Sequence, residues 1–186
     1  DAWYLLEYET GISRAMFFAD PDRMIEENIA ERYQKDIETR AERIPLQYIT
    51  GEQEFMGLTF KVNEHVLVPR QDTEVLVEEA LKRIMPGMKI LDMCTGSGCL
   101  LLSILMERSD AFGTGVDISE DALKVAGQNR KNLNLEERAV LVQSDTFSGD
   151  YFQKNSGNTS LEYDMLISNP PYIPTADIQQ LMDEVR

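Results

Sequence analysis

The second half of the chain alternates short apolar runs with longer helical patterns, and this alternation limits the possible folds more than any other feature. Four apolar runs have the length of strands: residues 88–93, 111–118, 139–144 and 163–168. Three amphipathic stretches have the length of helices: residues 72–85, 99–108 and 119–134. Strands that alternate with helices are typical of a parallel sheet covered on both faces. We therefore predict an α/β fold with a Rossmann-like parallel sheet.

The residues before this region have a different pattern. Residues 1–44 indicate helices, with a stripe that recurs every four positions at Ile25, Ile29, Tyr33, Ile37 and Ala41, in a helix that begins near Asp22 and ends before Pro45. The stretch EFMGLTFKV predicts a hairpin that turns at Gly57, and HVLVPR is a further short extended run. We predict a helical domain over 1–44, a β-hairpin linker over 45–71 and an α/β domain over 72–186, whose first helix is capped by Asp72 or Thr73.

Composition excludes several classes of function. The net charge is −15, whereas proteins that grip nucleic-acid phosphates carry a basic face, so we expect a cationic partner rather than nucleic acid. No apolar run reaches the length of a membrane span, and the first residues do not resemble a secretory signal. The two cysteines, Cys94 and Cys99, indicate neither a disulfide framework nor a metal site. We expect a cytoplasmic protein without a bound metal.

The stretch ILDMCTGSGCLLL has the form of a nucleotide-binding turn between a strand and a helix. Gly96 and Gly98 allow a close approach to the backbone, and Asp117 ends the next strand, where an acid meets ribose hydroxyls. Leu101 stands where the dinucleotide fingerprint has its third glycine, so a cofactor without a pyrophosphate is favoured. Asp92, at the end of the first strand, suits an ammonium group. S-adenosylmethionine (SAM) fits this set, although an ordinary tight turn with solvated acids is the alternative.

Two further segments reach the same edge of the sheet. Asp145 follows the third strand and can accept a hydrogen bond from the adenine amino group. The stretch ISNPPYIP follows the fourth strand, and its prolines fix acceptors in space. The Asn169 side-chain oxygen and the Pro170 backbone oxygen can each accept one N–H of a planar nitrogen, while Tyr172 stacks on it. Pro171 restricts Pro170, and the alternative is a rigid turn without a function.

In its motifs and their order, the chain resembles the HemK/PrmC family of class I SAM-dependent protein-(glutamine-N5) methyltransferases. The resemblance is carried by IPLQYITGEQEFMGLTF, VLVPRQDTE, ILDMCTGSGCLLL, VDIS, QSDTF and ISNPPYIP. It implies methylation of the glutamine in the Gly-Gly-Gln motif of class-1 peptide chain release factors. It also implies that the cofactor is bound by the loop Cys94, Thr95, Gly96, Ser97 and Gly98, by Asp117 and Ile118, and by Thr146 and Asn169. The substrate glutamine would bind at Asn169, Pro170, Pro171 and Tyr172.

The family pattern also leaves alternatives and departures. Cys94 stands where the family has a glycine, and Thr146 stands where some members have an aromatic residue. Such domains continue with further strands after the NPPY motif, so we expect a sheet that is incomplete within this chain, and little activity from this piece alone. The alternatives are a ribosomal-protein glutamine methyltransferase and a nucleic-acid adenine-N6 or guanine-N2 methyltransferase. An NAD-dependent oxidoreductase is opposed by Leu101 and by the NPPY motif.

Overall fold

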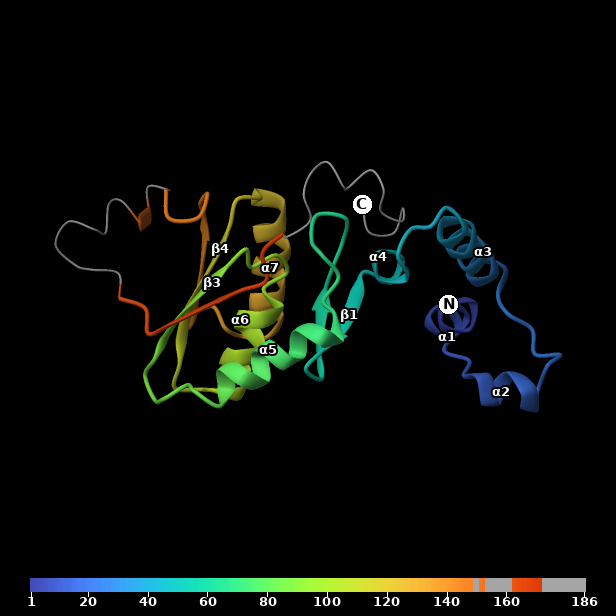
Figure 1. The fold of residues 1–186 in the computed structure, drawn as a ribbon. Coiled ribbons are helices and arrows are strands. Elements are labelled where there is room, and N and C mark those ends of the chain that lie inside the picture. Colours follow the sequence, from blue (N-terminus) through green and yellow to red (C-terminus); the bar gives the residue numbers. More distant parts are fainter. Residues whose placement is uncertain (149–150, 153–161, 172–186) are drawn as a thin grey trace. The chain divides into compact units, whose positions relative to one another are not determined.

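A computed structural model describes residues 1–148, 151–152 and 162–171 (Figure 1). The described residues fall into two compact units, one comprising residues 1–51 and the other beginning at residue 52. We describe each unit by itself.

The first unit is helical, as predicted. It contains α1 (Ala2–Thr10), α2 (Arg14–Ala19), α3 (Glu27–Ala41) and α4 (Leu46–Thr50). Leu5 of α1 is fully buried, and an edge-to-face contact between Trp3 and Phe17 joins α1 to α2. The predicted start near Asp22 is wrong, because Pro21 and Asp22 form a turn and Glu26 is still extended before α3 begins.

The predicted hairpin is confirmed at the start of the second unit. Strands β1 (Glu52–Phe55) and β2 (Leu58–Lys61) pair antiparallel, and they are joined by Met56 and Gly57, which both have positive φ angles. Such two-residue turns match the twist of the strands they connect. The rest of the linker differs from the prediction. Residues 46–50 form helix α4, which Gly51 ends in a left-handed conformation, and residues 62–70 contain no strand.

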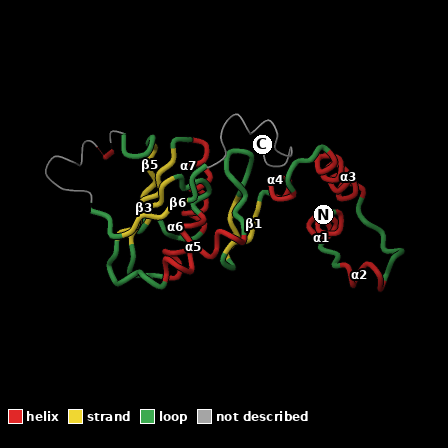
Figure 2. Tube along the Cα trace, in the orientation of Figure 1, coloured by secondary structure: helices red, strands yellow, loops and turns green. Residues whose placement is uncertain are grey.

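The predicted parallel sheet is confirmed. It contains β3 (Lys89–Met93), β4 (Phe112–Asp117), β5 (Ala139–Gln143) and β6 (Met165–Ser168), in the order β5-β4-β3-β6 (Figure 2). The connecting helices are α5 (Gln71–Leu81), α6 (Cys99–Glu107) and α7 (Glu120–Asn132). The chain adds β4 and β5 on one side of β3 and then returns to place β6 on the other side. Ligands of open α/β sheets bind at such a reversal, at the carboxyl ends of the strands.

The main core lies between the sheet and its helices. It contains Phe55 and Phe60 of the hairpin, Ile90 of β3 and the leucines of α6. Gly113 of β4 allows Leu101 of α6 to pack closely against the sheet, because a Cβ atom at Gly113 would lie 2.3 Å from Leu101 Cδ1. On the opposite face, Leu91, Met93 and Val116 are buried, and the partly buried Phe152 and Tyr163 pack against them. A layer of helices over this second face remains a prediction.

The residue predicted to cap a helix is confirmed for α7 and is wrong for α5. Ser119 caps α7 as predicted, since its hydroxyl accepts a hydrogen bond from the Ala122 N–H. The predicted cap of α5 is wrong, because Arg70 occupies the cap position without a side-chain bond. Asp72 instead lies in the first turn, where the helix dipole favours a negative charge.

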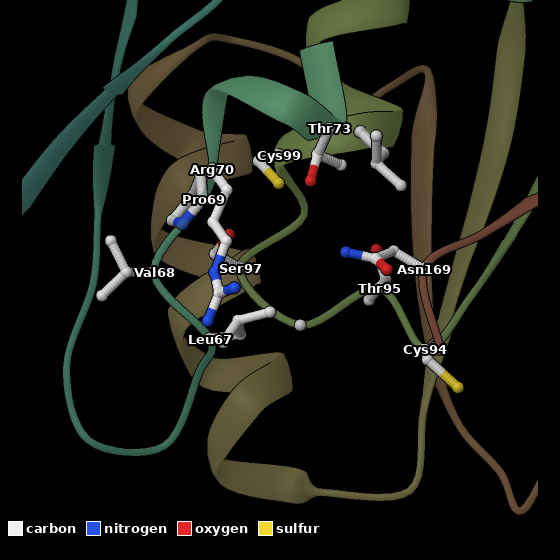
Figure 3. A pocket seen from close by; sticks show the side chains of 12 residues that line it. Leu67, Val68, Pro69, Arg70, Thr73, Cys94, Thr95, Ser97, Cys99 and Asn169 are labelled. Carbon is white, nitrogen blue, oxygen red and sulfur yellow. The ribbon is translucent and has the colours of Figure 1, made fainter. Parts of the chain in front are cut away.

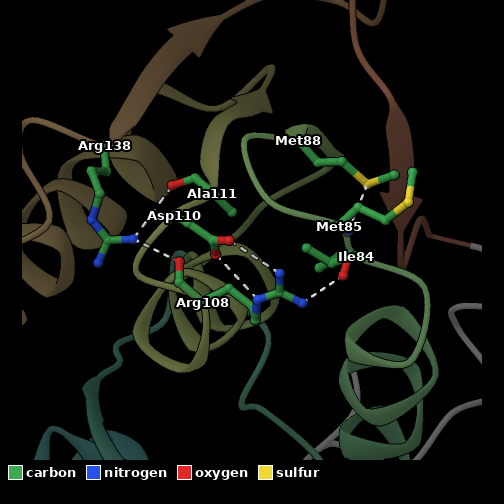
Figure 4. Close-up of polar contacts among 7 residues, drawn as sticks. All are labelled: Ile84, Met85, Met88, Arg108, Asp110, Ala111 and Arg138. Atoms are coloured by element: carbon green, nitrogen blue, oxygen red, sulfur yellow. Dashed lines mark hydrogen bonds and ion pairs between the residues drawn. The ribbon is translucent and has the colours of Figure 1, made fainter.

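Two arginines hold together the loops at the amino edge of the sheet (Figure 4). Arg108 forms a paired contact with both oxygens of Asp110 at 3.2 Å and donates to the Ile84 carbonyl. Arg138 donates to the carbonyls of Arg108 and Ala111, at 3.0 and 3.4 Å. These contacts lie at the amino edge of the sheet and do not involve the carboxyl edge, where ligands of such sheets bind. No helix in the described part of the chain combines the length and apolarity that a membrane crossing requires.

Candidate functional site

The parallel register brings the predicted site segments to one edge of the sheet. Met93 of β3 pairs with Val116 of β4 on one side and with Ser168 of β6 on the other. The loop that begins at Cys94 therefore emerges beside Asn169. The Ser168 hydroxyl also donates to the Met93 carbonyl at 2.7 Å, which fixes the end of β6 against β3.

The glycine loop is held to β4 by its own backbone. The Thr95 N–H donates to the Val116 carbonyl at 2.9 Å, and the Gly96 N–H donates to Asp117 Oδ2 at 2.9 Å. Gly98 has a φ of 80°, and a Cβ atom there would lie 2.9 Å from Leu102 Cδ1. Cys94 also has a positive φ, 63°, although it carries a side chain. The loop thus requires backbone conformations that favour glycine.

Asp92 is a buried acid directly beneath this loop. Its Oδ2 accepts a hydrogen bond from the Thr95 hydroxyl at 2.6 Å, while Oδ1 has no hydrogen-bond partner among the described residues. Burial raises the pKa of Asp92 to about 7, the Thr95 hydroxyl and the nearby Leu101 backbone amide oppose this rise, and the charge of Asp117 adds to it. No cationic side chain in the described part of the chain acts on this carboxylate, so a cation placed against it would stabilise its charge.

Asp117 stabilises the glycine loop and is also available to a ligand. Its Oδ2 accepts from Gly96, and its Oδ1 accepts from the Ser119 N–H at 3.0 Å. Each carboxylate oxygen can accept a further hydrogen bond. Asp117 can therefore still accept a ribose hydroxyl while it holds the loop.

A pocket lies between the glycine loop and the segment that precedes α5 (Figure 3). Its walls include five residues predicted from the sequence: Cys94, Thr95, Gly96, Ser97 and Asn169. The Asn169 side chain is directed into the pocket, from the side opposite Arg70. A substrate amide is predicted to bind at Asn169, and the pocket has space in front of this side chain.

Other predicted residues do not line this pocket. They are Asp92, Gly98, Asp117, Ile118, Asp145, Thr146, Pro170 and Pro171. Ile118 is exposed, and Asp145 and Thr146 lie in a turn after β5 in which Ser144 donates to the Thr146 carbonyl at 2.8 Å. Pro170 and Pro171 are exposed, and Tyr172 lies outside the described residues. The roles assigned to these residues stay predictions.

Sequence reasoning missed one wall of the pocket. It consists of residues 67–70 together with Thr73, and Arg70 is the one cationic side chain among the described residues that line the pocket. The stretch VLVPRQDTE carries part of the family resemblance, but residues 65–70 were predicted only as an extended run of the linker. The available signal was this family-specific stretch outside any predicted helix or strand, since binding residues are often found on loops.

Comparison with known proteins gives matches along the whole chain. Residues 84–186 match the model of a methyltransferase domain, and residues 1–51 match the PrmC N-terminal domain. A release factor glutamine methyltransferase of Caulobacter vibrioides is 40% identical over 188 residues, covering 100% of this chain and 62% of that protein. The protein of the same name from Moorella thermoacetica is 41% identical over 190 residues, covering 100% and 64%. The chain thus spans less than two thirds of these relatives.

Among solved structures, the tRNA (uracil-54, C5)-methyltransferase of Pyrococcus abyssi, in complex with S-adenosyl-L-homocysteine, is similar in part. It is 20% identical, with a TM-score of 0.49 over 64% of this chain and 28% of that one. This likeness is too low to bear on function.

Proposed function

Because the chain belongs to the family of methyltransferase domains and begins with a PrmC N-terminal domain, we propose that the complete protein methylates a glutamine side chain at N5 with SAM. The observation that carries this proposal is the position of Asn169. Its side chain is directed into a pocket whose other walls are the glycine loop and residues 67–70. The relatives named release factor glutamine methyltransferase support the same activity.

The residues present fit SAM as the cofactor. Asp92 offers a buried carboxylate oxygen without a partner in the described structure, which suits the ammonium of an amino acid. Thr95, which is bonded to Asp92, lines the pocket, so the acid lies one residue behind its wall. Asp117 stands at the end of β4, where a ribose diol is expected. When bound, SAM supplies a methyl group on a sulfonium, which a nucleophilic nitrogen can take.

Asn169 would orient the substrate nitrogen. An amide nitrogen is a poor nucleophile because its lone pair is delocalised into the carbonyl. The Asn169 Oδ1 atom and the Pro170 carbonyl can each accept one N–H, which fixes the nitrogen in the plane and favours the positive charge that develops on it. Proximity then supplies much of the rate, since the reaction needs mainly an in-line approach. Stacking by Tyr172 is part of the proposal.

The proposed substrate is the glutamine of the Gly-Gly-Gln motif in class-1 release factors. The relatives' names and the match of residues 1–51 to the PrmC N-terminal domain support it. We propose that the helical N-terminal region contributes to recognition of this protein partner, and that the reaction takes place in the cytoplasm. Both cysteines are free thiols in this structure, which agrees with a reducing compartment.

A labelling experiment tests the proposal. The protein at its full natural length is incubated with methyl-labelled SAM and, separately, with a release factor, a ribosomal-protein mixture or duplex DNA. We expect label on the glutamine of the release factor, located by peptide mass spectrometry, and no label in a Gly-Gly-Glu variant of that factor. Label on a ribosomal protein or on DNA alone would replace the proposed substrate by one of the two alternatives.

A shortened protein tests the recognition role. Removal of residues 1–44 should leave SAM binding intact and reduce methylation of the intact release factor. A free Gly-Gly-Gln peptide is the matched control, since both proteins should methylate it equally. Equal rates on the intact factor would refute the role of the N-terminal region.

A further inference from the structure

Asn129, on the buried side of α7, is bonded to two segments that are distant in sequence. Its Oδ1 accepts a hydrogen bond from the Lys61 N–H at 2.7 Å. Its Nδ2 donates to the Lys61 carbonyl at 3.0 Å and to the Ser97 carbonyl at 2.9 Å. The side chain is 1% exposed. A buried amide that serves three backbone groups is costly to replace, because each group would lose its partner away from water.

On one side, Asn129 fixes the glycine loop. The peptide group between Ser97 and Gly98 is held at both ends, since its carbonyl accepts from Asn129 and its N–H donates to the Thr95 carbonyl at 2.8 Å. This peptide therefore cannot rotate freely, which holds Gly98 at its φ of 80° and sets the start of α6. The Thr95 and Gly96 N–H groups bond to β4, so Asn129 provides the anchor on α7.

On the other side, Asn129 fixes the end of the hairpin. Lys61 is the last residue of β2, and both of its backbone groups pair with the Asn129 amide. From Lys61 the chain continues to residues 67–70, the pocket wall that faces the glycine loop. The Asn129 side chain is thus hydrogen-bonded both to the glycine loop and to the strand end that leads to the opposite wall of the pocket.

We propose that Asn129 is a positioning residue that sets the spacing between these two walls and thereby the affinity for the cofactor. The inference rests on the proposed function only for the identity of that cofactor. Loss of a residue that only stabilised the fold would affect the whole domain. Loss of the Asn129 amide should instead act locally, at Lys61 and at the Ser97–Gly98 peptide.

The neighbouring residue on the same helix gives a matched control. Arg130 donates to the Ala139 carbonyl at 3.0 Å and so joins α7 to β5, away from both pocket walls. Arg130→Met should lower stability without changing the pocket. Asn129→Ala removes all three hydrogen bonds. Asn129→Asp keeps an acceptor for the Lys61 N–H but turns an oxygen toward two carbonyl oxygens.

The first measurement needs no cofactor. Hydrogen exchange is compared at the Lys61 and Gly98 amides of the full-length protein, at a temperature where circular dichroism shows each variant folded. We expect faster exchange at both amides in Asn129→Ala, faster exchange at the Gly98 amide alone in Asn129→Asp, which keeps the acceptor for the Lys61 N–H, and unchanged exchange at both amides in Arg130→Met. The second measurement is calorimetric binding of S-adenosylhomocysteine, for which Asn129→Ala should be weaker by about tenfold, the effect of one to two hydrogen bonds.

The pH dependence separates positioning from simple destabilisation. Burial and the two facing carbonyls raise the pKa of the introduced carboxyl group in Asn129→Asp, and its protonated form regains one donor. Affinity of this variant should therefore recover as the pH falls from 8 to 6, relative to the unmodified protein at each pH. This variant also decides the matter if Asn129→Ala does not fold.

The outcomes are distinguishable. Unchanged exchange at Lys61 and Gly98, or an equal loss of affinity in Arg130→Met, would overturn the positioning role. If the unmodified protein binds no S-adenosylhomocysteine, the proposed function fails, and the exchange data still decide whether Asn129 holds the two walls.

Discussion

Replacing Asp92 by asparagine should stabilise the unliganded protein while weakening cofactor binding. Asp92 is fully buried, and its pKa is raised from 3.8 to about 7. Each pKa unit corresponds to about 1.4 kcal/mol, so ionised Asp92 opposes folding by roughly 4 kcal/mol above pH 7. The variant removes this charge but leaves an amide N–H₂ where Oδ1 has no partner in the described residues, at a cost of about 1–3 kcal/mol. The expected net gain at pH 8 is about 1–3 kcal/mol.

The sign of the pH dependence follows from the raised pKa of Asp92. Between about pH 4 and pH 7 the folded protein binds this proton and the unfolded chain does not, so rising pH lowers stability. Above about pH 7 both states are ionised and the full cost is present. Below about pH 4 both states are protonated and the cost vanishes. The stability of Asp92→Asn relative to the unmodified protein should therefore grow from pH 4 to pH 7 and then level off.

Urea unfolding at pH 5, 6, 7 and 8 measures this difference, with Asp110→Asn as a control. Asp110 is paired with Arg108 near the surface, and that guanidinium lowers the pKa of Asp110, so its substitution should not stabilise. Calorimetry with S-adenosylhomocysteine should show weaker binding to Asp92→Asn at pH 8. A stability difference that does not change with pH, or unchanged cofactor affinity, would refute the assigned role of Asp92.

Three further substitutions test the site. Asn169→Ala should lower the methylation rate at saturating SAM by about 10²–10³ and cofactor affinity far less, and near-normal turnover would show that the NPPY motif is only a rigid turn. Gly98→Ala should cost about 1–2 kcal/mol in urea unfolding and more than Gly96→Ala, because both have positive φ but only Gly98 has a side chain within 4 Å of the added Cβ. Cys94→Gly should gain about 0.5–1 kcal/mol by relief of the positive φ, and a loss would show that the thiol packing outweighs that strain.

The sequence predicted the features that depend on local pattern. Apolar runs bounded by turn signals located the four strands that the structure describes in the parallel sheet, and the alternation with helices predicted that they are parallel. Asp92, Asp117 and Asn169 could then be assigned to one edge, because parallel strands end on the same side. The glycine spacing predicted the loop, since positive φ angles at Gly96 and Gly98 favour glycine.

The features that sequence could not predict depend on contacts between distant segments. Residues 65–70 were predicted as a short extended run, but residues 67–70 form a pocket wall, and the strand before them ends at Lys61, which is bonded to Asn129, 68 residues away. The start of α3 at Glu27 was also missed, because Pro21 and Asp22 form a turn of their own rather than a cap. Local periodicity carries no information on either arrangement.

The central position of β3 has a consequence for the order in which the site forms during folding. β3 pairs with β4 across 23 residues, from Lys89 to Phe112, but with β6 across 75 residues, from Ile90 to Met165. Closing the longer loop costs about 1 kcal/mol more in chain entropy. During synthesis, moreover, the glycine loop and β4 emerge well before β6. The cofactor side of the pocket can therefore assemble first, and Asn169 completes it only when the last described strand docks beside β3.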